Sequence, residues 1–138
     1  MKLGIMTALF ADRPLPKVVE HVSRLGYEAV ELPAWANNGH TVLEDLVTPA
    51  GARKLKTLLA DHGLVLSALN EGIAGQLSMG PYDASTDPWL KGTPEEKAKY
   101  AADRLVKVAQ AASELEVPVV TGLIGSHVWD KWYIFPPA

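Results

Sequence analysis

The sequence predicts an α/β fold in which four parallel strands alternate with three helices. Three segments carry apolar residues at helical spacing, and each is followed by a short run rich in β-branched residues. Strands that alternate with helices pair in parallel through right-handed crossovers. Two architectures fit, a doubly wound sheet and half of a (β/α)8 barrel. Because no G-x-G-x-x-G and no P-loop signature follows the first strand, the barrel is favoured.

The first unit joins the opening strand, KLGIMT, to a second strand at residues 27–32. Pro14 and Pro16 suit the first turn of the intervening helix, where a missing N–H costs little. Gly26 ends this helix at a position that favours left-handed backbone. One face of the helix carries the apolar side chains of Leu15, Val18, Val22 and Leu25.

The second unit repeats this order of signals. Thr48 is the expected N-cap, Pro49 takes the first helical position and Gly63 ends the helix. The third strand is expected at residues 64–70. The buried face of the second helix is expected to comprise Leu55, Leu58, Leu59 and His62.

The third helix has the clearest start. Thr93 and Glu96 have the spacing of a capping box, and Pro94 follows the cap. The fourth strand is expected at residues 117–122. The apolar face of this helix comprises Ala101, Leu105, Val108, Ala112 and Leu115.

Composition narrows the classes of function. The 138 residues suffice for one domain, 48% are apolar, 21% are charged, and the formal net charge is −3. No basic block offers a face to nucleic acid or to an anionic membrane, so neither partner is expected. The absence of cysteine excludes disulfides and thiolate metal sites. Because no signal-peptide pattern and no run of about 20 apolar residues occurs, we expect a cytoplasmic protein.

Four segments together resemble the sugar phosphate isomerase/epimerase family, which belongs to the xylose isomerase-like barrels. They are KLGIMT at 2–7, LGYEAVEL at 25–32, HGLVLSALN at 62–70 and VPVVTGLIGSHVWDKWYIFPP at 117–137. The resemblance covers nearly the whole chain and implies the N-terminal half of a (β/α)8 barrel over residues 1–138. Complete barrels need about 250 residues. We therefore expect a chain truncated after strand four, with a natural half-barrel that pairs with a second copy as the alternative.

Two residues are candidates for catalysis. Glu31 lies near the C-terminal end of the second strand, the end at which barrel enzymes carry their active sites. Strand alternation places Glu31 opposite Val30 and Leu32, and we expect it to face the barrel interior. His127 follows the fourth strand, and histidine suits proton transfer near neutral pH. The simpler alternatives are a solvated or ion-paired carboxylate and a surface histidine.

Four residues are candidates for sugar binding. Asn70 ends the third strand, where its amide can bind a sugar hydroxyl, but alternation does not settle which face of that strand is inward. Trp35, Trp129 and Trp132 can form an apolar wall or simply close the barrel mouth. Glu71 is a weaker candidate. The remaining histidines, expected to be structural, are His21, His40 and His62.

The resemblance also implies a divalent ion, Mn, Mg, Zn or Co, held by Glu, Asp, His and Glu residues of strands five to eight. None of those strands is expected here, and no H-x-x-x-H, H-x-H or D-x-D spacing replaces them. We therefore expect no metal in this chain and none of the parent enzyme's activity from this chain alone. The long connection at 71–93 carries Met79, Tyr82 and Trp89, which is typical of a lid over a substrate.

The resemblance implies a parent enzyme that isomerises or epimerises a sugar or keto-sugar by moving a proton next to a carbonyl. The apurinic-site endonuclease branch of the superfamily is disfavoured, because it requires a basic surface and clustered histidines. A third possibility is a non-catalytic half-barrel module that binds a partner or a second copy. We expect self-association, because an open inner face lined with Val, Leu and Ile and two unpaired strand edges would remain exposed.

Overall fold

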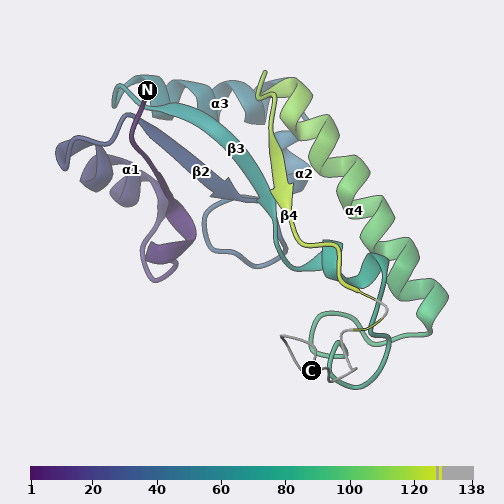
Figure 1. Ribbon diagram of the computed structural model, residues 1–138. Coiled ribbons are helices and arrows are strands. Elements are labelled where there is room, and N and C mark those ends of the chain that lie inside the picture. The colour runs from purple at the N-terminus through teal and green to yellow at the C-terminus, as the bar shows by residue number, and fades with distance from the viewer. Residues whose placement is uncertain (127, 129–138) are drawn as a thin grey trace.

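The computed structural model describes residues 1–126 and residue 128, and it contains one parallel sheet with strand order β1-β2-β3-β4 (Figure 1). The strands are β1 Gly4–Met6, β2 Ala29–Pro33, β3 Val65–Glu71 and β4 Val120–Gly122. In a barrel, neighbouring strands follow one another in chain order, as they do here. In a doubly wound sheet, the strand order reverses direction at a switch point. The predicted half-barrel is therefore confirmed.

The three expected helices are present. They are α1 Leu15–Arg24, α3 Pro49–Ala60 and α4 Pro94–Glu114, and they lie around the outside of the curved sheet (Figure 1). Three shorter elements were not predicted, because one helical turn shows no periodicity: α2 Leu43–Leu46 and the 3-10 turns η1 Thr7–Phe10 and η2 Ala74–Ser78. In the part of the chain that the structure describes, no helix is long and apolar enough to cross a membrane.

The ends of the helices follow the predicted signals. Thr48 Oγ1 accepts a hydrogen bond from the Gly51 N–H at 3.1 Å. Glu96 donates its N–H to Thr93 Oγ1 at 3.3 Å, while Thr93 donates its N–H to Glu96 Oε2 at 2.7 Å, which completes the capping box. Gly26 follows α1 with a φ of 86°. The helix boundaries could therefore be predicted from short-range chemistry alone.

We predict that Thr93→Ala lowers the free energy of unfolding by about 1 kcal/mol, because it removes the acceptor for an N-terminal amide of α4. Urea denaturation at fixed protein concentration measures the change. Thr57→Ala is the matched control, since Thr57 is exposed in the interior of α3, where alanine has the higher helix propensity. Equal losses in both variants would contradict the capping role.

A β-bulge interrupts the pairing of β2 with β3. Val30 pairs with Leu66, but Glu31 pairs with Ala68, so Ser67 is one extra residue in β3. An extra residue reverses the faces of all later side chains in its strand relative to the earlier alternation. For this reason, the alternation of residues along β3 could not predict which of its side chains point inward.

The bulge decides which side chains face the helices. Leu69 pairs with Leu32, and both belong to the core that packs against α1, α3 and α4. Glu31 and Asn70 lie on the opposite face, which we call the open face, while Glu71 turns to the helix side. The expected orientation of Glu31 away from Val30 and Leu32 is therefore what the structure has.

The open face differs in character from the expectation. Its paired strand residues include one Val, Val65, and no Leu or Ile, with Met6 as a further large apolar side chain, so the expected inner wall of Val, Leu and Ile is wrong. Exposed apolar side chains gather instead at β4 and just after it. Val120 is 40% exposed and Leu123 is 56% exposed.

Candidate functional site

Three polar side chains from three neighbouring strands meet on the open face. Glu31 Oε1 of β2 accepts hydrogen bonds from Asn70 Nδ2 of β3 at 3.0 Å and from Thr121 Oγ1 of β4 at 2.5 Å. Asn70 Nδ2 also donates to Thr121 Oγ1 at 2.7 Å. We call these three residues the Glu31 cluster. The cluster presents a carboxylate held in place by two donors.

Strand register builds the Glu31 cluster. Asn70 pairs with Thr121 across β3 and β4, so their side chains leave the same face. Glu31 pairs with Ala68, two residues before Asn70, so its side chain reaches along the sheet towards the C-terminal ends of the strands. Those ends carry the catalytic residues in barrels of this type.

A second feature lies just past the ends of β2 and β3. A Cβ atom placed on Gly72 would lie 2.9 Å from Asn70 Oδ1 and 3.7 Å from Cζ3 of the Trp35 ring. The missing side chain therefore keeps the amide oxygen and the ring edge accessible from one shared space. We call Trp35, Asn70 and Gly72 the strand-end cluster. It combines an aromatic surface with a hydrogen-bond acceptor, the pair of features that a sugar hydroxyl and its C–H face can use.

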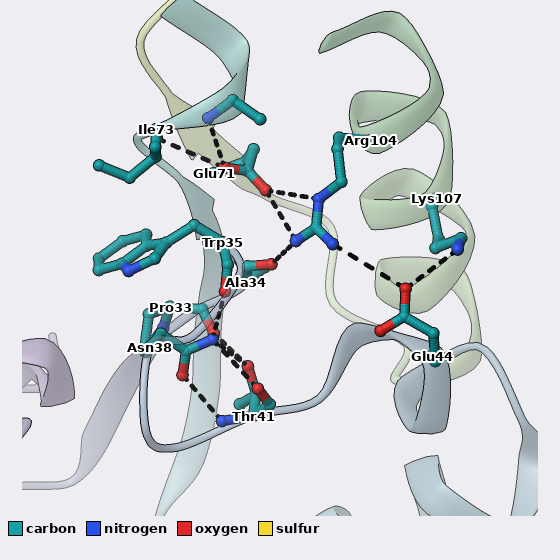
Figure 2. Close-up of polar contacts among 11 residues, drawn as sticks. Pro33, Ala34, Trp35, Asn38, Thr41, Glu44, Glu71, Ile73, Arg104 and Lys107 are labelled. Carbon is teal, nitrogen blue, oxygen red and sulfur yellow. Dashed lines mark hydrogen bonds and ion pairs between the residues drawn. The ribbon is translucent and has the colours of Figure 1, made fainter. Parts of the chain in front are cut away.

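A buried ion pair supports the strand ends from the helix side (Figure 2). Glu71 is fully buried, and its Oε2 accepts hydrogen bonds from Arg104 Nη2 at 3.1 Å and Nε at 3.3 Å. Arg104 Nη2 also donates to the carbonyl oxygen of Ala34. Glu71 Oε1 accepts the N–H groups of Ala74 at 2.9 Å and of Ile73 at 3.4 Å. One ion pair thus holds the end of β2 and the start of η2 together.

Glu44 of α2 extends the ion pair to the surface (Figure 2). Its Oε1 lies 3.1 Å from Lys107 Nζ and 4.0 Å from Arg104 Nη1. A hydrogen bond from its own backbone amide, followed by the one from Lys107, holds the pKa of the Glu44 carboxyl below its usual range. This carboxylate stays charged near neutral pH and binds α2 to α4.

The loop from Trp35 to α2 is fixed by a buried amide. Asn38 Nδ2 donates to the carbonyl oxygens of Trp35 at 2.6 Å and Thr41 at 3.1 Å, while Asn38 Oδ1 accepts the N–H groups of His40 and Thr41, both at 2.8 Å. His40 Nδ1 lies 2.9 Å from Thr7 Oγ1. A hollow of about 450 Å³ is lined by residues 35–44 and by Arg104 of α4. The hydrogen bonds of Asn38 hold the loop in one conformation beside this hollow.

The structure brings some predicted site residues together and leaves others outside its description. Glu31 and Asn70 share one cluster, and Trp35 approaches Asn70 across Gly72. The other three candidates lie outside the described residues: His127, Trp129 and Trp132.

Sequence reasoning missed Thr121, Arg104 and the depth at which Glu71 is buried. The position of Arg104 in the sequence could have indicated its buried role, because this residue lies between Ala101 and Val108 on the apolar face of α4. A cation on such a face implies a buried partner. No feature of the sequence pointed to Thr121, since a single hydroxyl residue in a strand is common.

The residues that the structure describes do not supply the ligands for a divalent ion. Within residues 1–126 and 128, no three His, Asp or Glu side chains come close enough to hold one. The Glu31 cluster offers one carboxylate, and a hard cation requires several oxygen ligands. No step in this chain is therefore assigned to a metal.

The comparison with protein families is decisive for the fold. A family model described as xylose isomerase-like TIM barrel matches residues 19–134. The chain belongs to this family. Comparison with curated proteins gives no match. The match covers most of the xylose isomerase-like chain, including both clusters described above.

One solved structure agrees with this xylose isomerase-like fold. A D-psicose 3-epimerase determined in the presence of D-fructose aligns with a TM-score of 0.55 and 16% identity, over 100% of this chain and 42% of that chain. A D-psicose 3-epimerase with D-tagatose from Clostridium cellulolyticum H10 aligns with a TM-score of 0.47 and 19% identity, over 88% of this chain and 37% of that chain. The xylose isomerase-like chain therefore spans less than half of either epimerase.

Proposed function

We propose that this chain is one half of a barrel enzyme that isomerises or epimerises a keto-sugar, and that its open face forms one wall of the substrate site. The Glu31 cluster carries the proposal, because it places a carboxylate near the C-terminal strand ends of a xylose isomerase-like barrel. The 42% coverage of the epimerase chain supports taking this chain as one half of a longer enzyme, and we propose that this enzyme is cytoplasmic.

The chemistry assigned to this half is binding and orientation. Glu31 Oε1 receives both bonds of its cluster, so Oε2 is available, among the described residues, to accept a substrate hydroxyl. Asn70 Oδ1 can accept a second hydroxyl, and the Trp35 ring can pack against the C–H face of the sugar. His127 would transfer a proton next to the carbonyl, and Trp129 and Trp132 would complete the apolar wall.

A divalent ion, Mn, Mg, Zn or Co, would polarise the substrate oxygens in the complete enzyme. Its ligands would come from the other half of the barrel. The partner of this chain is then a small sugar, and no nucleic acid or membrane is required.

The test is sugar binding by the isolated chain. We expect D-fructose to bind with a Kd of about 1–10 mM, because one wall supplies few contacts. Glu31→Gln and Asn70→Ala should each weaken binding about tenfold, a loss of about 1.4 kcal/mol. Glu28→Gln is the control, since Glu28 precedes β2 and its carboxylate accepts the Leu3 N–H instead of a bond from the Glu31 cluster. Chemical-shift perturbation measures all four proteins, and binding unaffected by both cluster variants would contradict the proposal.

A second function has one observation in its favour. The exposed Val120 and Leu123 at the β4 edge suit a non-catalytic half-barrel that binds a second copy or another partner. Self-association without any sugar binding would select this alternative.

A further inference from the structure

The peptide groups on both sides of Trp35 are held by two side chains, one from distant α4 and one from the loop that follows Trp35. The Ala34 carbonyl precedes Trp35 and accepts a hydrogen bond from Arg104, which lies 70 residues further along the chain. The Trp35 carbonyl follows and accepts from Asn38 at 2.6 Å. The Ala34 N–H donates to the Asn70 carbonyl at 2.7 Å. Fixing the peptide planes on both sides of one Cα fixes its φ and ψ, and therefore the direction in which its Cα–Cβ bond leaves the backbone.

We propose that Arg104 is a positioning residue that sets the direction of the Trp35 side chain at the border of the strand-end cluster. Figure 2 shows the guanidinium between Glu71, the Ala34 carbonyl and Glu44, with the Trp35 ring pointing away from it. Arg104 does not touch the open face and acts only through the backbone. The sugar-affinity part of this inference rests on the proposed function, whereas the positioning part does not.

Arginine suits this position better than lysine. Its planar fork donates to Glu71 and to the Ala34 carbonyl at once, and a lysine ammonium is a single point charge that cannot reproduce that geometry. Glu71 in turn neutralises the guanidinium, which is 10% exposed. Arg104 is the α4 side chain that lines the hollow of about 450 Å³ beside the loop, and it carries the hydrogen bond from that helix to the Ala34 carbonyl.

Fluorine NMR of protein labelled with 5-fluorotryptophan tests the proposal, because each of the four tryptophans gives its own resonance. Trp35→Phe assigns the signal. Arg104→Lys keeps the ion pair with Glu71 and should shift or broaden the Trp35 resonance while leaving the other three in place. The double variant Glu71→Gln/Arg104→Met removes the charges together, a replacement that buried ion pairs often tolerate. It should change the same resonance.

Lys107→Met is the matched control, since Lys107 lies on the same helix and binds Glu44 but neither Ala34 nor Glu71. It should leave the Trp35 resonance unchanged. A Trp35 resonance unchanged in folded Arg104→Lys and in the double variant would overturn the proposal.

D-fructose titration adds the functional measurement. Arg104→Lys should raise the Kd about tenfold, although its side chain does not contact the sugar site. If the Trp35 resonance moves as expected and the unmodified chain binds no D-fructose, the positioning role stands and the proposed sugar site fails. If the chain binds and Arg104→Lys leaves both the resonance and the Kd unchanged, the positioning role is wrong and the sugar site stands.

Discussion

The isolated chain is expected to self-associate at micromolar concentration. Within the described residues, β1 and β4 each pair on one side only, and a parallel sheet is normally covered on both faces. Unpaired strand edges recruit further strands. Leu3 beside β1 and Val120, Leu123 and Ile124 at β4 are exposed, so apolar surface lies at both edges. Pairing of β4 in one copy with β1 in another would bury these side chains and complete the backbone hydrogen bonds.

Lysine at the β4 edge should prevent this association. Burial of one such side chain contributes about 1.5–3 kcal/mol, so Val120→Lys/Leu123→Lys should weaken association by about 3 kcal/mol or more. That change corresponds to about a hundredfold in Kd. Sedimentation velocity over a concentration series gives the measurement.

Val106→Lys serves as the control for added charge, because Val106 is 60% exposed on α4 and lies on no strand edge. It should leave association unchanged. A compact monomer with cooperative unfolding, seen for the unmodified chain at the same concentrations, would show that the half-barrel needs no partner.

Glu71→Ala is expected to lower the free energy of unfolding by about 3–5 kcal/mol, because it leaves the buried Arg104 guanidinium without its hydrogen-bonded carboxylate. It also removes the acceptor for the N–H groups that begin η2. Glu44→Ala removes the other carboxylate near Arg104, but this side chain is 59% exposed and lies 4.0 Å from the guanidinium, so its loss should cost less than about 1 kcal/mol.

Urea unfolding of both variants at one fixed protein concentration compares the two carboxylates, since association makes apparent stability concentration-dependent. A loss in Glu71→Ala no larger than that in Glu44→Ala would contradict the structural account of the buried pair. The loss of unfolding free energy in Glu71→Gln should lie between the losses in Glu71→Ala and Glu44→Ala. The glutamine keeps an oxygen that accepts the Ala74 N–H but lacks the charge.

Local chemistry decided which parts of the fold could be predicted. Helix starts at Thr48 and Thr93 depend on contacts three residues apart, so they were predicted correctly. The face of Glu31 also followed from alternation within one short strand. The partners of Arg104 could not be predicted, because Ala34 and Glu71 lie 70 and 33 residues away and meet it only through the packing of α4 on the sheet.

The candidate site was predictable in part for the same reason. Parallel strands bring their carboxyl ends to one edge, so Glu31, Asn70 and Trp35 could be assigned to a common region. The hydrogen bond from Thr121 depends on the register between strands, and the space beside Gly72 depends on the backbone conformation beyond the end of β3. Neither can be predicted from the residue types alone.

The bulge at Ser67 makes the effect of a one-codon deletion in β3 depend on where the deletion falls. Loss of the Ser67 codon would leave Leu66 and Ala68 consecutive and on opposite faces, so regular pairing could form with Asn70 still on the open face. Loss of the Leu69 codon would instead place Asn70 opposite Leu32 on the helix side and Glu71 opposite Pro33 on the open face, although neither residue had changed. The gene therefore tolerates a lost codon at the bulge better than one just beyond it.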